Sequence, residues 1–88
     1  MESLTISAIS NPIRIKILCC LSKGSKNVQE LIESCGLSQS AISQHLIKLK
    51  KANLVKGKKV GKFVYYSVID NKTAKVANIL HSFCKEVI

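Results

Sequence analysis

Capping residues and glycines divide the chain into short segments, and this spacing limits what it can fold into. Asn11-Pro12 is typical of a helix start, and Gly24 is expected to stop the helix that follows. Asn27, with Glu30 three residues later, resembles a capping box at the start of a second helix. The pattern therefore predicts several short helices with tight turns between them, the first extending to about residue 23.

The next stretch predicts two helices joined by a glycine turn and then a hairpin. Gly36 is expected to end one helix, Ser38 to cap the next, and Asn53 to stop that helix after residues 39–52. Two helices joined in this way form a helix-turn-helix. Residues 54–59 and 62–68 read as strands around a Val60-Gly61 turn, because the second is rich in strand-forming residues.

These elements predict a mostly α-helical fold with a small β-hairpin, a winged helix-turn-helix of order α-α-α-α-β-β-α. Residues 1–88 form one domain, with a helix over the first nine residues and a last helix capped by Asp70. In the helix over residues 12–23 the expected core stripe is Ile13, Ile17, Leu18, Cys20 and Leu21, with Ile15 and Cys19 opposite. The expected apolar stripe of the last helix is Val76, Ala77, Leu80, Phe83, Cys84 and Val87.

Positive charge is concentrated in one part of the chain. The sequence has 14 Lys and Arg against 5 Asp and Glu, a net charge of +9. No acid lies between Ser34 and Ile69, a window that contains Lys48, Lys50, Lys51, Lys56, Lys58, Lys59 and Lys62. A merely solubilising surface would mix both signs, so this pattern predicts contact with a nucleic acid, and the helix-turn-helix makes double-stranded DNA the expected partner. No apolar run is long enough to span a membrane, and we expect a cytoplasmic protein.

The predicted second helix of the motif would present a DNA-reading face opposite Ile42. Candidate base contacts are Gln39, Ser40, Ser43 and Gln44, because amide and hydroxyl groups can pair with base edges. Candidate phosphate contacts are Lys48 and Lys51 on the helix and Lys58, Lys59 and Lys62 on the hairpin. His45 fits either a phosphate contact or a structural, hydrogen-bonded histidine. Tyr65 and Tyr66 are better explained as packing residues than as base stackers.

The four cysteines are expected to be reduced thiols, and none forms a Cys-x-x-Cys motif. Cys20 and Cys35 lie on predicted core stripes, where cysteine commonly serves as a small apolar residue. No histidine-plus-acid constellation accompanies a cysteine, so we do not expect a thiol enzyme, and no cofactor is predicted. A winged helix used only for protein contacts is an alternative function. Neutralising the lysines would leave such a function largely intact.

Three segments give the chain a resemblance to the ArsR/SmtB repressors. They are residues 10–18 (SNPIRIKIL), 37–46 (LSQSAISQHL) and 60–66 (VGKFVYY), in that order. The resemblance implies a homodimer paired through its terminal helices. It also implies binding to an inverted-repeat operator, repression of nearby genes and release by an inducer.

The inducer is the feature in which members of this family differ. Asn27-Val28-Gln29 stands where arsenic- and cadmium-sensing members carry Cys-Val-Cys, and Asp70 lacks the histidine partner of the zinc-sensing members. The chain instead resembles the two-cysteine, BigR- and HlyU-like branch, which implies a reactive-sulfur or oxidant switch at Cys19 and Cys84. A soft-metal site that uses His81 and Cys84 is the alternative.

Overall fold

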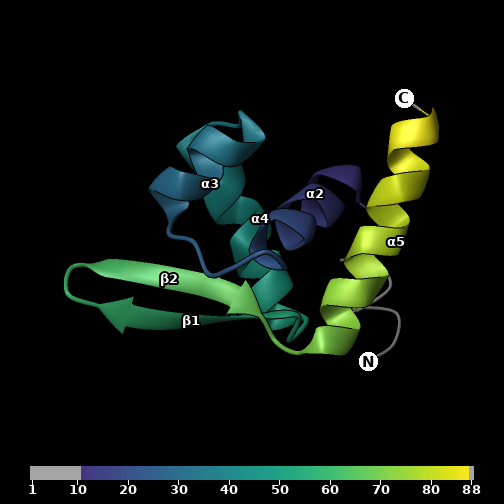
Figure 1. Cartoon of the computed structure of the whole chain (residues 1–88). Coiled ribbons are helices and arrows are strands. Elements are labelled where there is room, and N and C mark those ends of the chain that lie inside the picture. The colour runs from purple at the N-terminus through teal and green to yellow at the C-terminus, as the bar shows by residue number, and fades with distance from the viewer. Residues whose placement is uncertain (1–10, 88) are drawn as a thin grey trace.

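The computed structural model describes residues 11–87 (Figure 1). The side chains of residues 83–87 lie outside the described part. The order of elements over this range agrees with the predicted winged helix-turn-helix. The helix expected over the first nine residues lies outside the described residues. The elements are α2 (Pro12–Leu21), α3 (Val28–Cys35), α4 (Gln39–Lys51), β1 (Val55–Val60), β2 (Phe63–Val68) and α5 (Asn71–Val87).

Side-chain caps explain where the helices begin. The Asn11 side chain accepts hydrogen bonds from two backbone N–H groups of the first turn of α2. Asn27 and Glu30 form the reciprocal capping box of α3, with bonds of 2.8 and 3.0 Å. Ser38 accepts from the N–H of Ala41 at the start of α4. These bonds satisfy helix N–H groups that have no partner within the helix, and they confirm the predicted starts.

The helix ends are confirmed at two of three positions. Gly36 after α3 and Asn53 after α4 end these helices as predicted, with positive φ angles of 70° and 61°. Helix α2 ends at Leu21 rather than near Lys23. The prediction was too long because Ser22 already caps the helix and residues up to Gly24 form a turn.

The hairpin is confirmed, but its turn lies one residue later than predicted. Val60 pairs with Phe63, so Gly61 and Lys62 form the loop and Val60 still belongs to β1. Gly61 has a φ of 63°, whereas the φ of Lys62 is not positive. This combination is typical of a type II′ turn, whose first central position favours glycine. The glycine therefore begins the turn instead of ending it.

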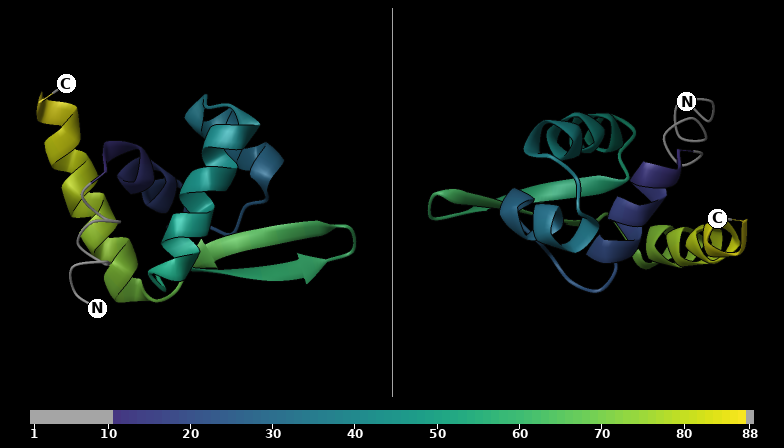
Figure 2. Two further views of the ribbon diagram at one scale, coloured as in Figure 1. Left: turned by 180° about the vertical axis from the view of Figure 1, so that it is seen from behind. Right: turned by 90° about the horizontal axis from the view of Figure 1, so that it is seen from above.

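Helix α2 is covered on more sides than its sequence pattern indicated. Ile15 and Cys19, predicted to lie away from the core, are 4% and 7% exposed, while Ile13 is 37% exposed. Helix α5 packs along α2 on the side away from the hairpin, and the Cys19 thiol contacts Asn78 of this helix (Figures 1 and 2). The main core also includes residues of α3 and α4, among them Cys35 and Ile42 as predicted, together with Leu31, Leu46 and Leu49.

Helix α5 has one face on the domain and one face open. Ala77 is 1% exposed and Leu80 is half-buried, whereas Val76 and Ile79 are 38% and 59% exposed. Of the apolar stripe predicted for this helix, Ala77 and Leu80 pack on the domain and Val76 is left exposed in the single chain, while Phe83, Cys84 and Val87 lie where side chains are not described. None of the described helices combines the length and apolar character that a membrane span requires.

Candidate DNA-binding surface and cysteine sites

One face of α4 is largely exposed to solvent and carries the predicted reading residues. Ile42, on the opposite face, is fully buried, while Gln39, Ser40 and Gln44 are exposed and Ser43 is half-buried. The apolar Ile47 is 56% exposed within the same face. Further along the helix this face continues into two exposed lysines, Lys48 and Lys51. The amphipathic pattern of residues 39–51 thus positions a polar and basic helix face at the surface.

His45 lies at the edge of this face and links α4 to α2. Its Nδ1 atom accepts a hydrogen bond from Nε of the buried Arg14 across 3.2 Å. Partial burial, with the positive charges of Arg14 and Lys48, lowers the pKa of His45 below its usual value. The neutral imidazole is therefore favoured, which fits the structural alternative better than a charged phosphate contact.

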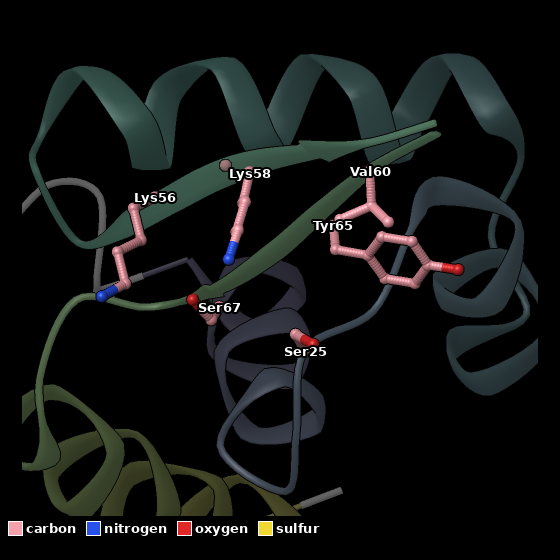
Figure 3. Close-up of a pocket in the computed structure, with 7 residues that line it drawn as sticks. Ser25, Lys56, Lys58, Val60, Tyr65 and Ser67 are labelled. Atoms are coloured by element: carbon pink, nitrogen blue, oxygen red, sulfur yellow. The ribbon is translucent and has the colours of Figure 1, made fainter. Parts of the chain in front are cut away.

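The hairpin lysines lie on two different faces. Lys58 pairs with Tyr65 and Lys59 with Val64, and successive residues of a strand point to opposite sides. Lys56 and Lys58 line a hollow of about 600 Å³ on one side of the hairpin (Figure 3). Lys62 occupies the turn, with its amine 5.8 Å from the centre of the Phe63 ring. The predicted basic tip therefore has positive charge on both faces and at its end.

The two tyrosines of β2 take structural roles, as expected. Tyr66 packs against the core, and its backbone N–H and carbonyl exchange hydrogen bonds of 2.8 and 2.9 Å with Lys26. Tyr65 is half-buried and meets the Phe63 ring edge-on at 6.5 Å. The Tyr66–Lys26 bonds therefore connect β2 to the segment before α3.

Cys19 lies between α2 and α5 in a small polar cluster. Its thiol donates to Oδ1 of Asn78 across 3.0 Å, and its sulfur is 3.7 Å from Nδ1 of His81. The Asn78 side chain is held in place by two further hydrogen bonds: its Nδ2 donates to the Ala74 carbonyl across 2.9 Å and to the Ser22 hydroxyl across 3.4 Å. The predicted switch cysteine therefore contacts α5 directly. Its predicted partner, Cys84, lies outside the described side chains.

Cys20, the next residue of α2, faces a different helix. Its sulfur lies 3.6 Å from the sulfur of Cys35 at the end of α3. Burial, together with the hydrogen bond and charge of Cys20, raises the pKa of Cys35 to about 12. Cys20 and Cys35 are core-packing residues as predicted, but they also form a close pair of thiols, which the sequence pattern did not indicate.

A family model decides the class of protein. The model described as "Bacterial regulatory protein, arsR family" matches residues 11–56, which run from the cap of α2 into β1. The chain belongs to the ArsR family. This match covers the predicted helix-turn-helix and confirms the resemblance over two of the three sequence segments, those around α2 and α4, while the third segment, residues 60–66, lies beyond it.

Several relatives extend this ArsR-family similarity over most of the chain. The nodulation protein NolR of Rhizobium meliloti is 41% identical over 75 residues, which are 85% of this chain and 62% of NolR. The transcriptional activator HlyU of Vibrio cholerae is 36% identical over 76 residues, 86% of this chain and 70% of HlyU. The solved structure of the transcriptional repressor BigR from Xylella fastidiosa has a TM-score of 0.81 at 27% identity, covering 93% of this chain and 84% of that one.

HlyU and BigR are named as transcriptional regulators rather than enzymes, which agrees with the expectation that this chain is not an enzyme. Sequence reasoning missed Asn78, the residue that binds the Cys19 thiol. A signal was present, because Ala74, Ala77, Asn78 and His81 recur at helical spacing on the face that meets α2. A polar residue within such a face predicts a partner on the facing helix.

Proposed function

We propose that this chain is a dimeric repressor that leaves its operator when Cys19 and Cys84 are joined by a disulfide or polysulfide bridge. The observation that carries the proposal is the position of the Cys19 thiol, which lies against α5 and within 3.7 Å of His81. Cys84 follows His81 by three residues, about 4.5 Å along a helix axis. Cys19 therefore lies near the part of α5 that carries Cys84.

The DNA-binding part of the proposal rests on the open face of α4 and the basic hairpin. A helix of this kind enters the major groove, where Gln44 and the neighbouring polar residues reach base edges. Lys48 and Lys51, with Lys58, Lys59 and Lys62 of the hairpin, contact phosphates and set the position of the helix. The double-stranded operator is an inverted repeat, because a symmetric dimer presents two α4 helices related by a two-fold axis.

The dimer is proposed to form through α5 together with the N-terminal segment. Val76 and Ile79 leave apolar surface exposed along one side of α5, opposite the face that packs on α2. A domain of this size gains stability by burying such surface against a second copy. Helix α5 would then contact α2 of its own chain on one side and the partner on the other.

This arrangement connects thiol chemistry to DNA binding. A bridge between Cys19 and Cys84 removes both thiol hydrogens and replaces the Cys19–Asn78 hydrogen bond with a covalent link between α2 and α5. Because α5 also carries the dimer contacts, a shift of α5 changes the separation of the two α4 helices. Two half-sites at fixed spacing then no longer fit both helices at once. The inducer class is a reactive sulfur species or an oxidant.

The direction of regulation is part of the proposal. BigR is described as a repressor and HlyU as an activator, so family membership alone leaves both directions open. A dimer that occupies a promoter when reduced blocks transcription, and loss of DNA on thiol modification restores it. We therefore infer repression.

The test is binding to duplex DNA from the protein's own promoter region, measured by fluorescence anisotropy. Reduced protein is compared with protein treated with polysulfide and repurified. Tight binding when reduced, loss after treatment and recovery with reductant support the proposed switch. Equal binding in both states contradicts the switch, and no specific binding in either state contradicts the repressor assignment.

Single variants assign the switch to its residues. Cys19→Ser and Cys84→Ser should each bind DNA when reduced and keep that binding after polysulfide. Cys20→Ser is the matched control, because Cys20 is the next residue of the same helix and faces α3 instead of α5. It should still lose DNA on treatment. Loss of the response in Cys20→Ser would show that the response depends on Cys20 and not on Cys19 and Cys84 alone, which contradicts the proposed assignment.

A soft metal is the second candidate inducer, and the Cys19–His81 contact favours it. A thiolate and an imidazole are suitable ligands for zinc or copper(I), and Cys84 would supply a third. Among the side chains that the structure describes, no group of three metal-binding residues occurs. Metal binding survives reductant whereas a disulfide does not. Release of DNA by Zn²⁺ in excess reductant, lost in His81→Ala, would replace the thiol switch with this alternative.

A further inference from the structure

We propose that Cys20 and Cys35 form a second, independent thiol site, in which a hydroperoxide converts the pair into a disulfide that links α2 to α3. The two sulfurs are already 3.6 Å apart in the reduced protein. A disulfide bond is about 2.05 Å long, so closure requires the sulfurs to approach by about 1.5 Å. Side-chain rotation combined with a small shift of the helices can supply this distance.

The surroundings hold the two helices at this separation. The Lys16 side chain of α2 donates to the backbone carbonyl of Cys35 across 3.2 Å. Besides the contact between the two sulfurs, this bond also connects α2 to the end of α3. Cys35 is also the last residue of α3, directly before Gly36 and the turn of the helix-turn-helix. The proposed disulfide would therefore fasten the turn of the DNA-binding motif to α2.

The two thiols differ in access, which sets the order of the reaction. Cys20 is half-buried, whereas Cys35 is 5% exposed. With hydrogen peroxide as the oxidant, the Cys20 sulfur attacks one oxygen, the O–O bond breaks, and the products are a Cys20 sulfenic acid and water, which takes the thiol proton. The sulfur of Cys35 then displaces the hydroxyl group, which leaves as a second water with the Cys35 proton. Two thiols lose two electrons, and one hydrogen peroxide is reduced to two waters.

This site is separate from the proposed switch. Cys19 and Cys20 are adjacent in α2, yet the first contacts Asn78 of α5 and the second contacts Cys35 of α3. One turn of α2 thus carries a thiol for each neighbouring helix. Oxidation at Cys20 and Cys35 ties the domain internally and does not involve α5.

The experiment uses the full chain with Cys19→Ser and Cys84→Ser, so that Cys20 and Cys35 are its remaining cysteines. The reduced variant is first shown to be folded by circular dichroism and is then treated with hydrogen peroxide. The expected product has the mass of a single chain less two hydrogen atoms, and reductant restores the original mass. Trypsin should yield residues 17–23 linked to residues 27–48.

Three results would overturn the proposal: an unchanged mass, a covalent dimer, or added oxygen atoms without a linked peptide pair. A further Cys20→Ser substitution is the matched control and should abolish the linked product. It is preferred to a change at Cys35, because Cys20 is the less buried of the two and its replacement perturbs the core less. The readout is a mass, so it is independent of DNA binding and of the proposed switch.

Discussion

The Nε atom of Arg14 in α2 donates a hydrogen bond of 3.2 Å to Nδ1 of His45 in α4. This bond requires an unprotonated Nδ1, so the imidazole is neutral with its proton on Nε2. Helix α4 is thereby connected to α2, the helix that also contacts α5. A histidine in this position makes the stability of the α2–α4 packing dependent on pH.

We predict that the protein loses stability as the pH falls below about 6.5 and that His45 contributes to this loss. Its pKa is lowered in the folded state from 6.5, so near that pH the unfolded chain binds more protons than the folded one. The contribution is complete above the unfolded pKa and declines as the pH falls toward the folded value. Urea unfolding between about pH 7.5 and 5.5, where most carboxylates stay ionised, measures it.

The matched variant is His45→Gln, which keeps a hydrogen-bond acceptor for Arg14 but does not titrate. Its stability should vary less over the same pH interval, and the difference between the two proteins isolates the histidine. Equal slopes for the two proteins would show that His45 does not titrate differently on folding.

We predict that Lys48→Gln weakens DNA binding and reduces its dependence on salt. Each phosphate contact releases counterions, so loss of one contact lowers the slope of log K against log salt concentration by about one. A dimer carries the substitution twice, and the slope should fall by about two. Anisotropy titrations at several salt concentrations measure both quantities.

Lys23→Gln is the control for this prediction. Lys23 is exposed but lies in the turn after α2, outside α4 and the hairpin. Its replacement removes the same charge from the chain and should leave the salt slope nearly unchanged. If both variants lower the slope equally, net charge rather than the α4 surface governs DNA binding.

Local chemistry made much of this fold predictable. Asn11, Asn27 and Asp70 cap helices through bonds to residues two or three positions away, and such short-range pairs can be recognised from the sequence. Gly36 and Asn53 end helices through their own backbone conformation. The hairpin turn was misplaced by one residue because a glycine can begin or end a two-residue turn, and strand register decides between these positions.

What the sequence could not predict depends on contacts between distant elements. Cys19 was placed away from the core because the pattern of α2 alone does not show that α5 covers a second side of it. The approach of Cys20 to Cys35 spans fifteen residues and depends on how α2 and α3 cross. The role of His45 was left open for the same reason, since its partner Arg14 is 31 residues away.

We predict that Asn27→Ala destabilises the protein by about 1 kcal/mol. The Asn27 side chain accepts from the backbone N–H of Glu30, and no other group in α3 replaces this bond. Asn27→Asp keeps an acceptor at the N-terminal end of the helix and should lose less. Chemical denaturation of the three proteins measures the difference. Equal losses in the two variants would indicate that the amide packs rather than caps.

We predict that Ile79→Glu weakens the dimer. Ile79 is 59% exposed on the side of α5 that faces away from α2, so the substitution should not disturb the core of the single chain. In a dimer paired through α5, it would place two carboxylates in an apolar contact, where burial of charge without a partner is costly. Sedimentation equilibrium should show a higher dissociation constant. Ile47→Glu, at a similarly exposed isoleucine of α4 (56%), is the control and should weaken DNA binding without changing the association state. Loss of the dimer in Ile47→Glu, or its retention in Ile79→Glu, would place the dimer interface elsewhere.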